Sequence, residues 1–263
     1  MGRQTVLLVY GGESTEHDVS VRSTRSVFAA MDGEKYDTLL CYVDPHGKWW
    51  LLERWTEQLD EHGGSQLVAA LGSHSFLVLP GNALIRPDVI VPLLIDSKEN
   101  ESVMGLARLL HISLVAPSTD TSALARHLEG VRAKLARRDI VLGTSDTPPD
   151  ERMVIALAGT AKEPTVSGVA SVVDGDTSDD ALRSIGDDES IRRVTTIAQG
   201  AYEILRCRNY ALVTVHRRDD QLELATVDVY PELSTSGTFL KLWRMSGIHY
   251  PEVVDTLIAT ARK

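Results

Sequence analysis

The sequence is poor in cysteine, in long apolar runs and in positive charge, and each shortage excludes a class of protein. The two cysteines, Cys41 and Cys207, have no CxxC spacing, which argues against a structural zinc site and fits a reducing compartment. The apolar run at residues 89–95 is far too short to span a bilayer. A net charge of −10 argues against general nucleic-acid binding, which needs a basic surface. We therefore expect a cytoplasmic protein with neither a membrane nor a nucleic acid as partner.

The most informative stretch is TVLLVYGGESTEHDVS at residues 5–20. Its apolar beginning predicts a buried strand, and Gly11 and Gly12 end that strand in a tight turn. Thr15 and Asp18 fit a capping box at the start of a helix. On shape alone this is the first βα unit of an open α/β sheet. The exposed N–H groups of such a turn favour an anion or a carboxylate as ligand.

The rest of the chain predicts two lobes and a connector. Alternating strands and helices over residues 1–117, with an exposed helix near 54–64, predict an α/β domain: an open parallel sheet with helices on both faces. A long helical stretch and a linker with glycine and prolines make up the connector, residues 118–150. Hairpins and helices over 151–263 predict an α+β lobe, interrupted by an acidic and mobile segment at 175–190.

Both ends of the chain resemble the D-alanine–D-alanine ligases, which are ATP-grasp enzymes of peptidoglycan synthesis. The similarity is carried by YGGESTEHDVSVRSTRSVFAAM near the N-terminus and LWRMSGIHYPEVVDTLI near the C-terminus, and covers about residues 4–140 and 151–262. It implies that the C-terminal lobe resembles the second half of an ATP-grasp domain. It also implies substrate binding by Glu16, Val19 and Ser20, because the family glutamate that matches Glu16 holds the amino group of the first D-alanine.

The residue type of Glu16 leaves a second interpretation open. A carboxylate at a helix N-terminus is stabilised by the helix dipole, so Glu16 is also explained as part of the architecture of the first βα unit. Amine binding and an architectural role therefore remain alternatives. The eight histidines show no metal-binding spacing along the chain, and only His17 lies near the predicted site.

The resemblance places unsuitable residues at the metal positions. The family supplies an aspartate, a glutamate and an asparagine to Mg²⁺, and these positions correspond to Thr214, Thr226 and Asp228. Only Asp228 could still be a ligand, and one carboxylate makes a poor Mg²⁺ site. We therefore expect no metal, with Asp228 either a remnant of the site or an ordinary residue at a strand end.

The resemblance also implies that the transition-state groups are replaced. Leu212 stands where the family has an arginine, and Glu232 where it has a glycine. The family loop HGxYGEDG corresponds to LIDSKENE at 94–101, so Leu94 replaces its histidine. Acyl-phosphate chemistry builds negative charge on an oxygen, which hydrogen-bond donors and cations stabilise. Losing a cation and adding a carboxylate both oppose that charge.

The nucleotide lobe of the family has no counterpart here. The family places a lysine, a Gly/Ser-rich phosphate loop and an adenine hinge before the C-terminal lobe, but here only residues 141–151 fill that interval. The family sequence Met-Asp-Lys becomes Arg126-His127-Leu128, and a following lysine becomes Arg132. The loop that closes the family active site corresponds to 175–190, which contains neither tyrosine nor lysine.

Three hypotheses follow from these substitutions. The first is a ligase homologue without ligase activity or cofactor, which acts by binding or assembly. The family resemblance then implies a homodimer through the N-terminal domain, or a heterodimer with an active ligase, with a small amino acid as a candidate ligand. The second is an active carboxylate–amine ligase that uses ATP and Mg²⁺ in a rebuilt or partner-completed site. The third is a purely structural subunit.

Overall fold

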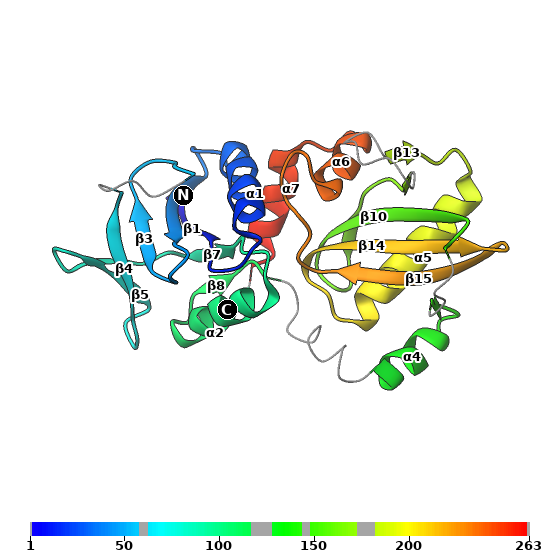
Figure 1. Cartoon of the computed structure of the whole chain (residues 1–263), viewed down its shortest axis with the longest axis horizontal. Coiled ribbons are helices and arrows are strands. Elements are labelled where there is room, and N and C mark those ends of the chain that lie inside the picture. The colour runs from blue at the N-terminus through cyan, green and yellow to red at the C-terminus, as the bar shows by residue number, and fades with distance from the viewer. Residues whose placement is uncertain (1, 58–62, 117–127, 144–147, 173–181, 262–263) are drawn as a thin grey trace. The chain divides into compact units, whose positions relative to one another are not determined.

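The computed structural model describes residues 2–57, 63–116, 128–143, 148–172 and 182–261 (Figure 1). The chain divides into two compact units. The first unit contains residues 1–116, 232–235 and 257–263. The second unit contains residues 117–231 and 236–256. Two short segments that the sequence placed in the C-terminal lobe, 232–235 and 257–263, therefore belong to the first unit.

The described part of the first unit forms one eight-stranded sheet in the order β6-β5-β4-β3-β2-β1-β7-β8. The strands are β1 (Gln4–Gly11), β2 (Tyr36–Val43), β3 (Trp49–Leu52), β4 (Ser65–Ala70), β5 (Ser75–Leu79), β6 (Ala83–Ile85), β7 (Val89–Pro92) and β8 (Ser113–Leu114). Strands β2, β1, β7 and β8 run parallel, which confirms the predicted parallel sheet. Strands β3 to β6 extend it in antiparallel fashion. The sequence reading missed β4 and β6.

Helices α1 (His17–Ala30) and α2 (Ser97–Leu109) cover opposite faces of this sheet (Figure 1). In the strand order, β2 lies on one side of β1, whereas β8 lies on the opposite side of β7, so the two connections run in opposite directions along the sheet. Because crossovers between parallel strands are right-handed, opposite steps place the two helices on opposite faces. The prediction of helices on both faces is therefore confirmed.

The described part of the second unit forms a seven-stranded sheet with the order β13-β12-β10-β14-β15-β9, in which β11 also pairs with β10. The strands are β9 (Val141–Leu142), β10 (Glu151–Gly159), β11 (Pro164–Val166), β12 (Ala170–Val172), β13 (Leu182–Ser184), β14 (Asn209–Arg218) and β15 (Gln221–Asp228). The helices in the remainder of the chain are α4 (Leu128–Ala136), α5 (Asp188–Ile204), α6 (Thr238–Met245) and α7 (Tyr250–Ala259).

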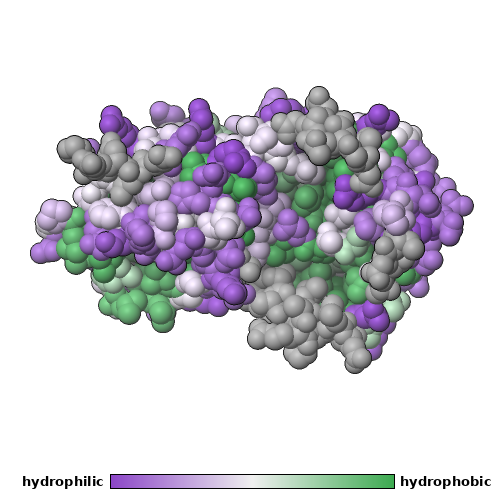
Figure 2. All heavy atoms as spheres, viewed as in Figure 1, coloured by the Kyte–Doolittle hydropathy of each residue, from purple (hydrophilic) through white to green (hydrophobic). Residues whose placement is uncertain are grey.

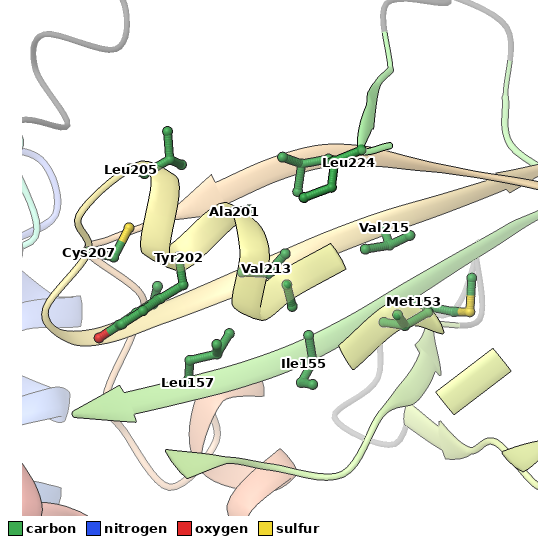
Figure 3. Packing of buried hydrophobic residues seen from close by; sticks show 14 of the residues in the cluster. Met153, Ile155, Leu157, Ala201, Tyr202, Leu205, Cys207, Val213, Val215 and Leu224 are labelled. Atoms are coloured by element: carbon green, nitrogen blue, oxygen red, sulfur yellow. The ribbon is translucent and has the colours of Figure 1, made fainter. Parts of the chain in front are cut away.

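Helix α5 packs on one face of the second sheet, and the hydrophobic core lies between the helix and the sheet (Figure 3). Val213 and Val215 of β14 point into this core together with Ile155 of β10 and Ala201 of α5. The hydroxyl of Tyr202 donates to the carbonyl of Gly159 over 3.0 Å, which satisfies its polar end inside the core. Side chains alternate along a strand, so the residues between these core positions lie on the opposite face.

Several local expectations were wrong. Helix α1 begins at His17 with Glu16 as N-cap and no side-chain capping bond, so the predicted capping box is absent. Residues 54–57 and 63–64 are not helical, and 58–62 lie outside the described residues. Of the segment at 175–190, residues 175–181 lie outside the described part, and the remainder contains β13 and the start of α5, where the Asp187 carboxylate accepts from the N–H groups of Glu189 and Ser190. The acidic composition of this segment predicted mobility, whereas the local capping signal at Asp187 marks the start of a helix.

The described part of the connector contains one helix and one strand. Of the long helix predicted over residues 118–140, α4 covers Leu128–Ala136, and residues 118–127 lie outside the described part. The predicted linker contributes β9, which pairs in parallel with β15.

No helix in the described part of the chain is long and apolar enough to cross a membrane. Hydrophilic residues cover much of the visible face in Figure 2.

Candidate functional site

The turn after β1 requires both of its glycines. Gly11 and Gly12 have φ values of +93° and +106°, and a Cβ atom on Gly11 would lie 2.3 Å from the carbonyl oxygen of Val43. The N–H of Gly12 donates to that same oxygen over 2.9 Å. The N–H of Gly11 donates to the hydroxyl oxygen of Ser20, also over 2.9 Å. Ser20 is fully buried, so its hydroxyl ties α1 to the turn.

His17 locks the other side of the turn. Its Nδ1 lies 2.8 Å from the carbonyl oxygen of Gly12, and its Nε2 lies 3.1 Å from the Tyr42 hydroxyl. A carbonyl can only accept, so Nδ1 carries the proton and Nε2 accepts from Tyr42. Burial, and then the charges of Asp44 and Asp18, raise the pKa of Tyr42, which keeps its proton available for this bond. The imidazole therefore links the Gly12 turn to Tyr42 through hydrogen bonds at both ring nitrogens.

The carboxylate of Glu99 fills the anion-binding side of the turn. Its Oε1 accepts the N–H of Glu13 over 2.6 Å, and a Cβ atom on Gly12 would lie 2.6 Å from its Oε2. That Oε2 is buried and has no hydrogen-bond partner among the described residues. Asp96 starts α2 by accepting from the N–H of Glu99, which places Glu99 in the first turn of the helix. The anion predicted to bind this turn is therefore a side chain of the protein itself.

Leu94 lies in the hydrophobic core instead of facing a ligand. It is 4% exposed and packs with residues of the central strands and α2. Its carbonyl oxygen accepts a hydrogen bond from the side-chain amide of Asn100, which is itself 1% exposed. An apolar side chain at this position gains by leaving water, whereas a histidine would need a polar partner there. The substitution is therefore consistent with packing.

Glu16 and Val19 remain accessible at the start of α1. Glu16 is exposed, and its carboxylate makes no hydrogen bond or ion pair with any residue of the described chain. Val19 is half-buried and lies one turn before Arg22 on the same face of the helix. Of the three residues predicted to bind substrate, these two have side chains free for a ligand, while Ser20 is engaged inside the turn.

Glu232 is held against α1. Its Oε1 lies 3.5 Å from Nε of Arg22 and accepts the hydroxyl of Ser234 over 2.5 Å. The N–H of Leu233 donates to the hydroxyl oxygen of Ser23 over 3.2 Å. These bonds align the segment Glu232–Thr235 with the face of α1 that begins at Val19. A carboxylate thus occupies the place where the family resemblance implies a glycine, and Arg22 compensates its charge.

The positions matched to the family metal ligands and to the family arginine form one compact block on the second sheet. In the register of β14 and β15, Thr214 pairs with Thr226, and Leu212 pairs with Asp228. Val213 points into the core under α5, so the four residues of the block lie on the opposite face. The structure therefore brings together positions that lie on two different strands and that the resemblance selected separately.

The chemistry of this block is unsuited to Mg²⁺. Asp228 carries its only carboxylate, and the Oδ1 atom of that group accepts the N–H of Tyr230 over 2.9 Å. Partial burial raises the pKa of Asp228, which opposes ionisation. The described residues contain no group of three or more histidines, cysteines, aspartates or glutamates that could hold a metal ion. Two threonines, a leucine and one carboxylate do not make the oxygen-rich shell that Mg²⁺ requires.

Two family models match the chain. The model described as D-ala D-ala ligase N-terminus matches residues 5–112, and the one described as D-ala D-ala ligase C-terminus matches residues 173–259. The chain belongs to the D-alanine–D-alanine ligase family. It is 25% identical to a D-alanine–D-alanine ligase of Sodalis glossinidius and 22% identical to one of Mycolicibacterium smegmatis, and each alignment covers 99% of this chain and 96% of the relative.

Solved structures of similar proteins share the fold. The D-alanine–D-alanine ligase from Coxiella burnetii has a TM-score of 0.84 at 16% identity, and the match covers 99% of this chain and 94% of that one. The VanG D-Ala:D-Ser ligase from Enterococcus faecalis has a TM-score of 0.83 at 16% identity, covering 98% of this chain and 99% of the other. At this identity the likeness concerns the fold alone.

The alignments show that this chain is internally shorter than its relatives. The alignment with the Sodalis glossinidius ligase spans 350 residues, whereas this chain has 263, so at least 87 positions lack a residue of this chain. The two family models leave residues 113–172 unmatched. That interval contains the short connection between α4 and β10.

The sequence reading missed two groups of the site. Glu99 was treated only as part of the loop counterpart at 94–101, although Asp96 followed three residues later by Glu99 is a capping-box pattern that marks the start of α2. Arg22 was not singled out, because nothing local relates it to Glu232. Its role follows only from the contact between distant parts of the chain.

Proposed function

We propose that this member of the D-alanine–D-alanine ligase family no longer makes the dipeptide and acts by binding or assembly. The observation that carries the proposal is the block of Leu212, Thr214, Thr226 and Asp228. Its register makes the four positions neighbours, and its side chains provide one carboxylate with a raised pKa. A phosphate-bridging Mg²⁺ needs several oxygen ligands, and these residues do not provide them.

The substituted charges support the same proposal. In the second unit, Leu212 provides no cation where the family resemblance implies an arginine. In the first unit, Glu232 adds a carboxylate, and a carboxylate opposes a developing negative charge that donors and cations would stabilise. The shorter length of this chain relative to the aligned relative supports the proposal that the nucleotide lobe is absent before β10.

The remaining accessible group is the Glu16 carboxylate. It lies at the N-terminus of α1 without a partner among the described residues, beside the half-buried Val19. We propose that this corner binds the ammonium group of a small amino acid, with an architectural role for Glu16 as the competing interpretation. Partners follow from the family: a homodimer through the first unit, or a heterodimer with an active ligase, in the cytoplasm.

The alternative function is an ATP-dependent carboxylate–amine ligase whose site is rebuilt or completed by a partner. The observation that favours it is the Gly11-Gly12 turn, which follows the family motif, together with the free Glu16 carboxylate. In that case ATP and Mg²⁺ would be required, and the missing lobe would come from another chain.

A calorimetric titration of the full chain with ATP·Mg²⁺ tests the proposal, followed by an ADP-release assay with D-alanine. We expect neither nucleotide binding nor ADP release. Micromolar binding with sustained ADP release would establish the alternative. A titration with D-alanine alone tests the corner, with Glu16→Gln as the variant and Glu101→Gln, an exposed glutamate on α2, as the matched control. Binding that both variants share would place the ligand elsewhere.

A further inference from the structure

Two histidines from distant parts of the first unit form a pair on its surface. His74 lies in the turn between β4 and β5, and His111 follows the end of α2. Their ring centroids are 5.1 Å apart, and the ring planes are tilted by 36°. Both side chains are exposed. The pair belongs neither to the turn at Gly11 nor to the block around Asp228.

The backbone at both histidines is held in defined turns. His74 and His111 have φ values of 55° and 52°, in the left-handed region where histidine is one of the tolerated residues. The N–H of His111 donates to the carbonyl of Arg108 over 3.1 Å at the helix end. The turn that carries His74 is closed by a bond of 3.1 Å from the N–H of Ser73 to the carbonyl of Ala70. Fixed anchor points reduce the entropy lost when both side chains bind one ligand.

The separation of the ring centroids allows both imidazoles to bind one metal ion. A zinc–nitrogen bond of about 2.0–2.1 Å places each imidazole centre about 3.2 Å from the metal, and a tetrahedral angle then separates the two centres by about 5.2 Å. The observed separation is 5.1 Å. Imidazole nitrogen is a ligand of choice for Zn²⁺ and related transition metals, whereas Mg²⁺ and Ca²⁺ prefer oxygen.

We propose that His74 and His111 bind one zinc-type divalent transition-metal ion, with water in the remaining coordination positions. No third histidine, cysteine, aspartate or glutamate joins them in a metal-binding group within the described chain. Two protein ligands leave open positions, so the ion exchanges readily and is accessible to an added group. Binding fastens the β4–β5 turn to the end of α2. The site is independent of the proposed loss of ligase activity.

Titration of the metal-free full chain with ZnCl₂ in a calorimeter tests the site. The variants are His74→Asn and His111→Asn, because asparagine also tolerates the left-handed backbone and so preserves both turns. Matched controls are His46→Asn and His249→Asn, which change exposed histidines elsewhere. Circular dichroism without zinc checks that each variant is folded.

We expect one zinc per chain in the wild type and in both controls, and binding at least tenfold weaker in each single variant. A thermal-shift series should show stabilisation by Zn²⁺ and none by Mg²⁺ in the wild type, and loss of the zinc effect in the two variants. Zinc binding unchanged in His74→Asn or His111→Asn would overturn the proposal. So would the absence of binding in the wild type, or an equal loss in the controls.

Discussion

Thr214 and Thr226 face each other across the β14–β15 hairpin, on the side of the sheet away from α5. The neighbouring pair, Leu212 and Asp228, completes a block of four positions that the family resemblance matched to functional positions. The two strands pair in register across this block, and the register shifts only after Thr214. The proposed loss of metal binding is therefore a matter of side chains and can be tested by substitution.

Restoring the acidic residues should restore a metal effect. In the variant Leu212→Arg/Thr214→Asp/Thr226→Glu/Asp228→Asn, the block regains two carboxylates and an amide, which are oxygen ligands that Mg²⁺ accepts. We expect Mg²⁺ to raise the melting temperature of this variant and to leave the wild type unchanged. The control carries Thr165→Asp and Thr196→Glu, at positions on β11 and α5. An equal Mg²⁺ response of the control would mean that two carboxylates placed elsewhere on this unit have the same effect, because the fourfold variant leaves the net charge unchanged.

Asp228→Asn should stabilise the protein at neutral pH. Burial raises the pKa of Asp228 in the folded state, so folding favours its protonated form and the ionised carboxylate weakens the fold. Stability from this group is present at low pH and is lost as pH rises through the raised pKa. The amide keeps an oxygen for the N–H of Tyr230. In urea denaturation at pH 7, the free energy of unfolding should be larger for the variant than for the wild type. The difference should shrink towards pH 4.

The magnitude of that difference is limited by solvent. The Asp228 side chain is exposed by its surface area, so water screens part of the desolvation that raises its pKa. Asp220→Asn, in the exposed hairpin turn, provides the control, although its left-handed backbone also favours asparagine. A stabilisation of Asp228→Asn that is independent of pH would contradict the raised pKa as its cause.

Gly12→Ala should destabilise the first unit. Gly12 has a φ of +106°, and a Cβ atom there would lie 2.6 Å from the Glu99 carboxylate. We expect a loss of about 1–3 kcal/mol in the free energy of unfolding, because an alanine in this conformation is strained. Gly105→Ala is the matched control, since nothing lies within 4 Å of its added Cβ in the interior of α2. That control should gain about 1 kcal/mol from helix propensity.

Both changes are measured by urea denaturation of the full chain. Equal effects of the two substitutions would show that the turn does not need its left-handed glycine. A destabilised Gly12→Ala that recovers with the added change Glu99→Ala would instead locate the cost in the contact with the carboxylate.

A double-mutant cycle on Arg22 and Glu232 should give a small coupling. Their side chains are 53% and 30% exposed, and the Nε–Oε1 distance is 3.5 Å, so the ion pair is partly screened. We expect a coupling energy of about 0.2–1 kcal/mol that falls as NaCl is added. The control cycle on Arg25 and Glu57, whose side chains are more exposed, should couple less. A coupling that is insensitive to salt would contradict an ion pair and indicate a packing contact.

Local patterns in the sequence determined the elements that depend on nearby residues. The apolar run and glycines of residues 5–20 predicted the strand and turn that form β1 and the Gly11-Gly12 turn. The hairpins predicted for the C-terminal lobe include β14–β15, whose turn residues Asp219 and Asp220 both adopt positive φ. Such features follow from backbone preference and side-chain period, which act over a few residues.

Only the tertiary structure decided which distant groups meet. The reach of Glu99 to the Gly12 turn, the pairing of Arg22 with Glu232 and the approach of His74 to His111 each join residues far apart in the chain. No spacing rule predicts these contacts, because they depend on strand order and on the faces that the helices cover. The sequence by itself determined the family and the identity of the altered residues. The fold determined that four of them, Leu212, Thr214, Thr226 and Asp228, form one block and that the Glu16 carboxylate is left without a partner in the described chain.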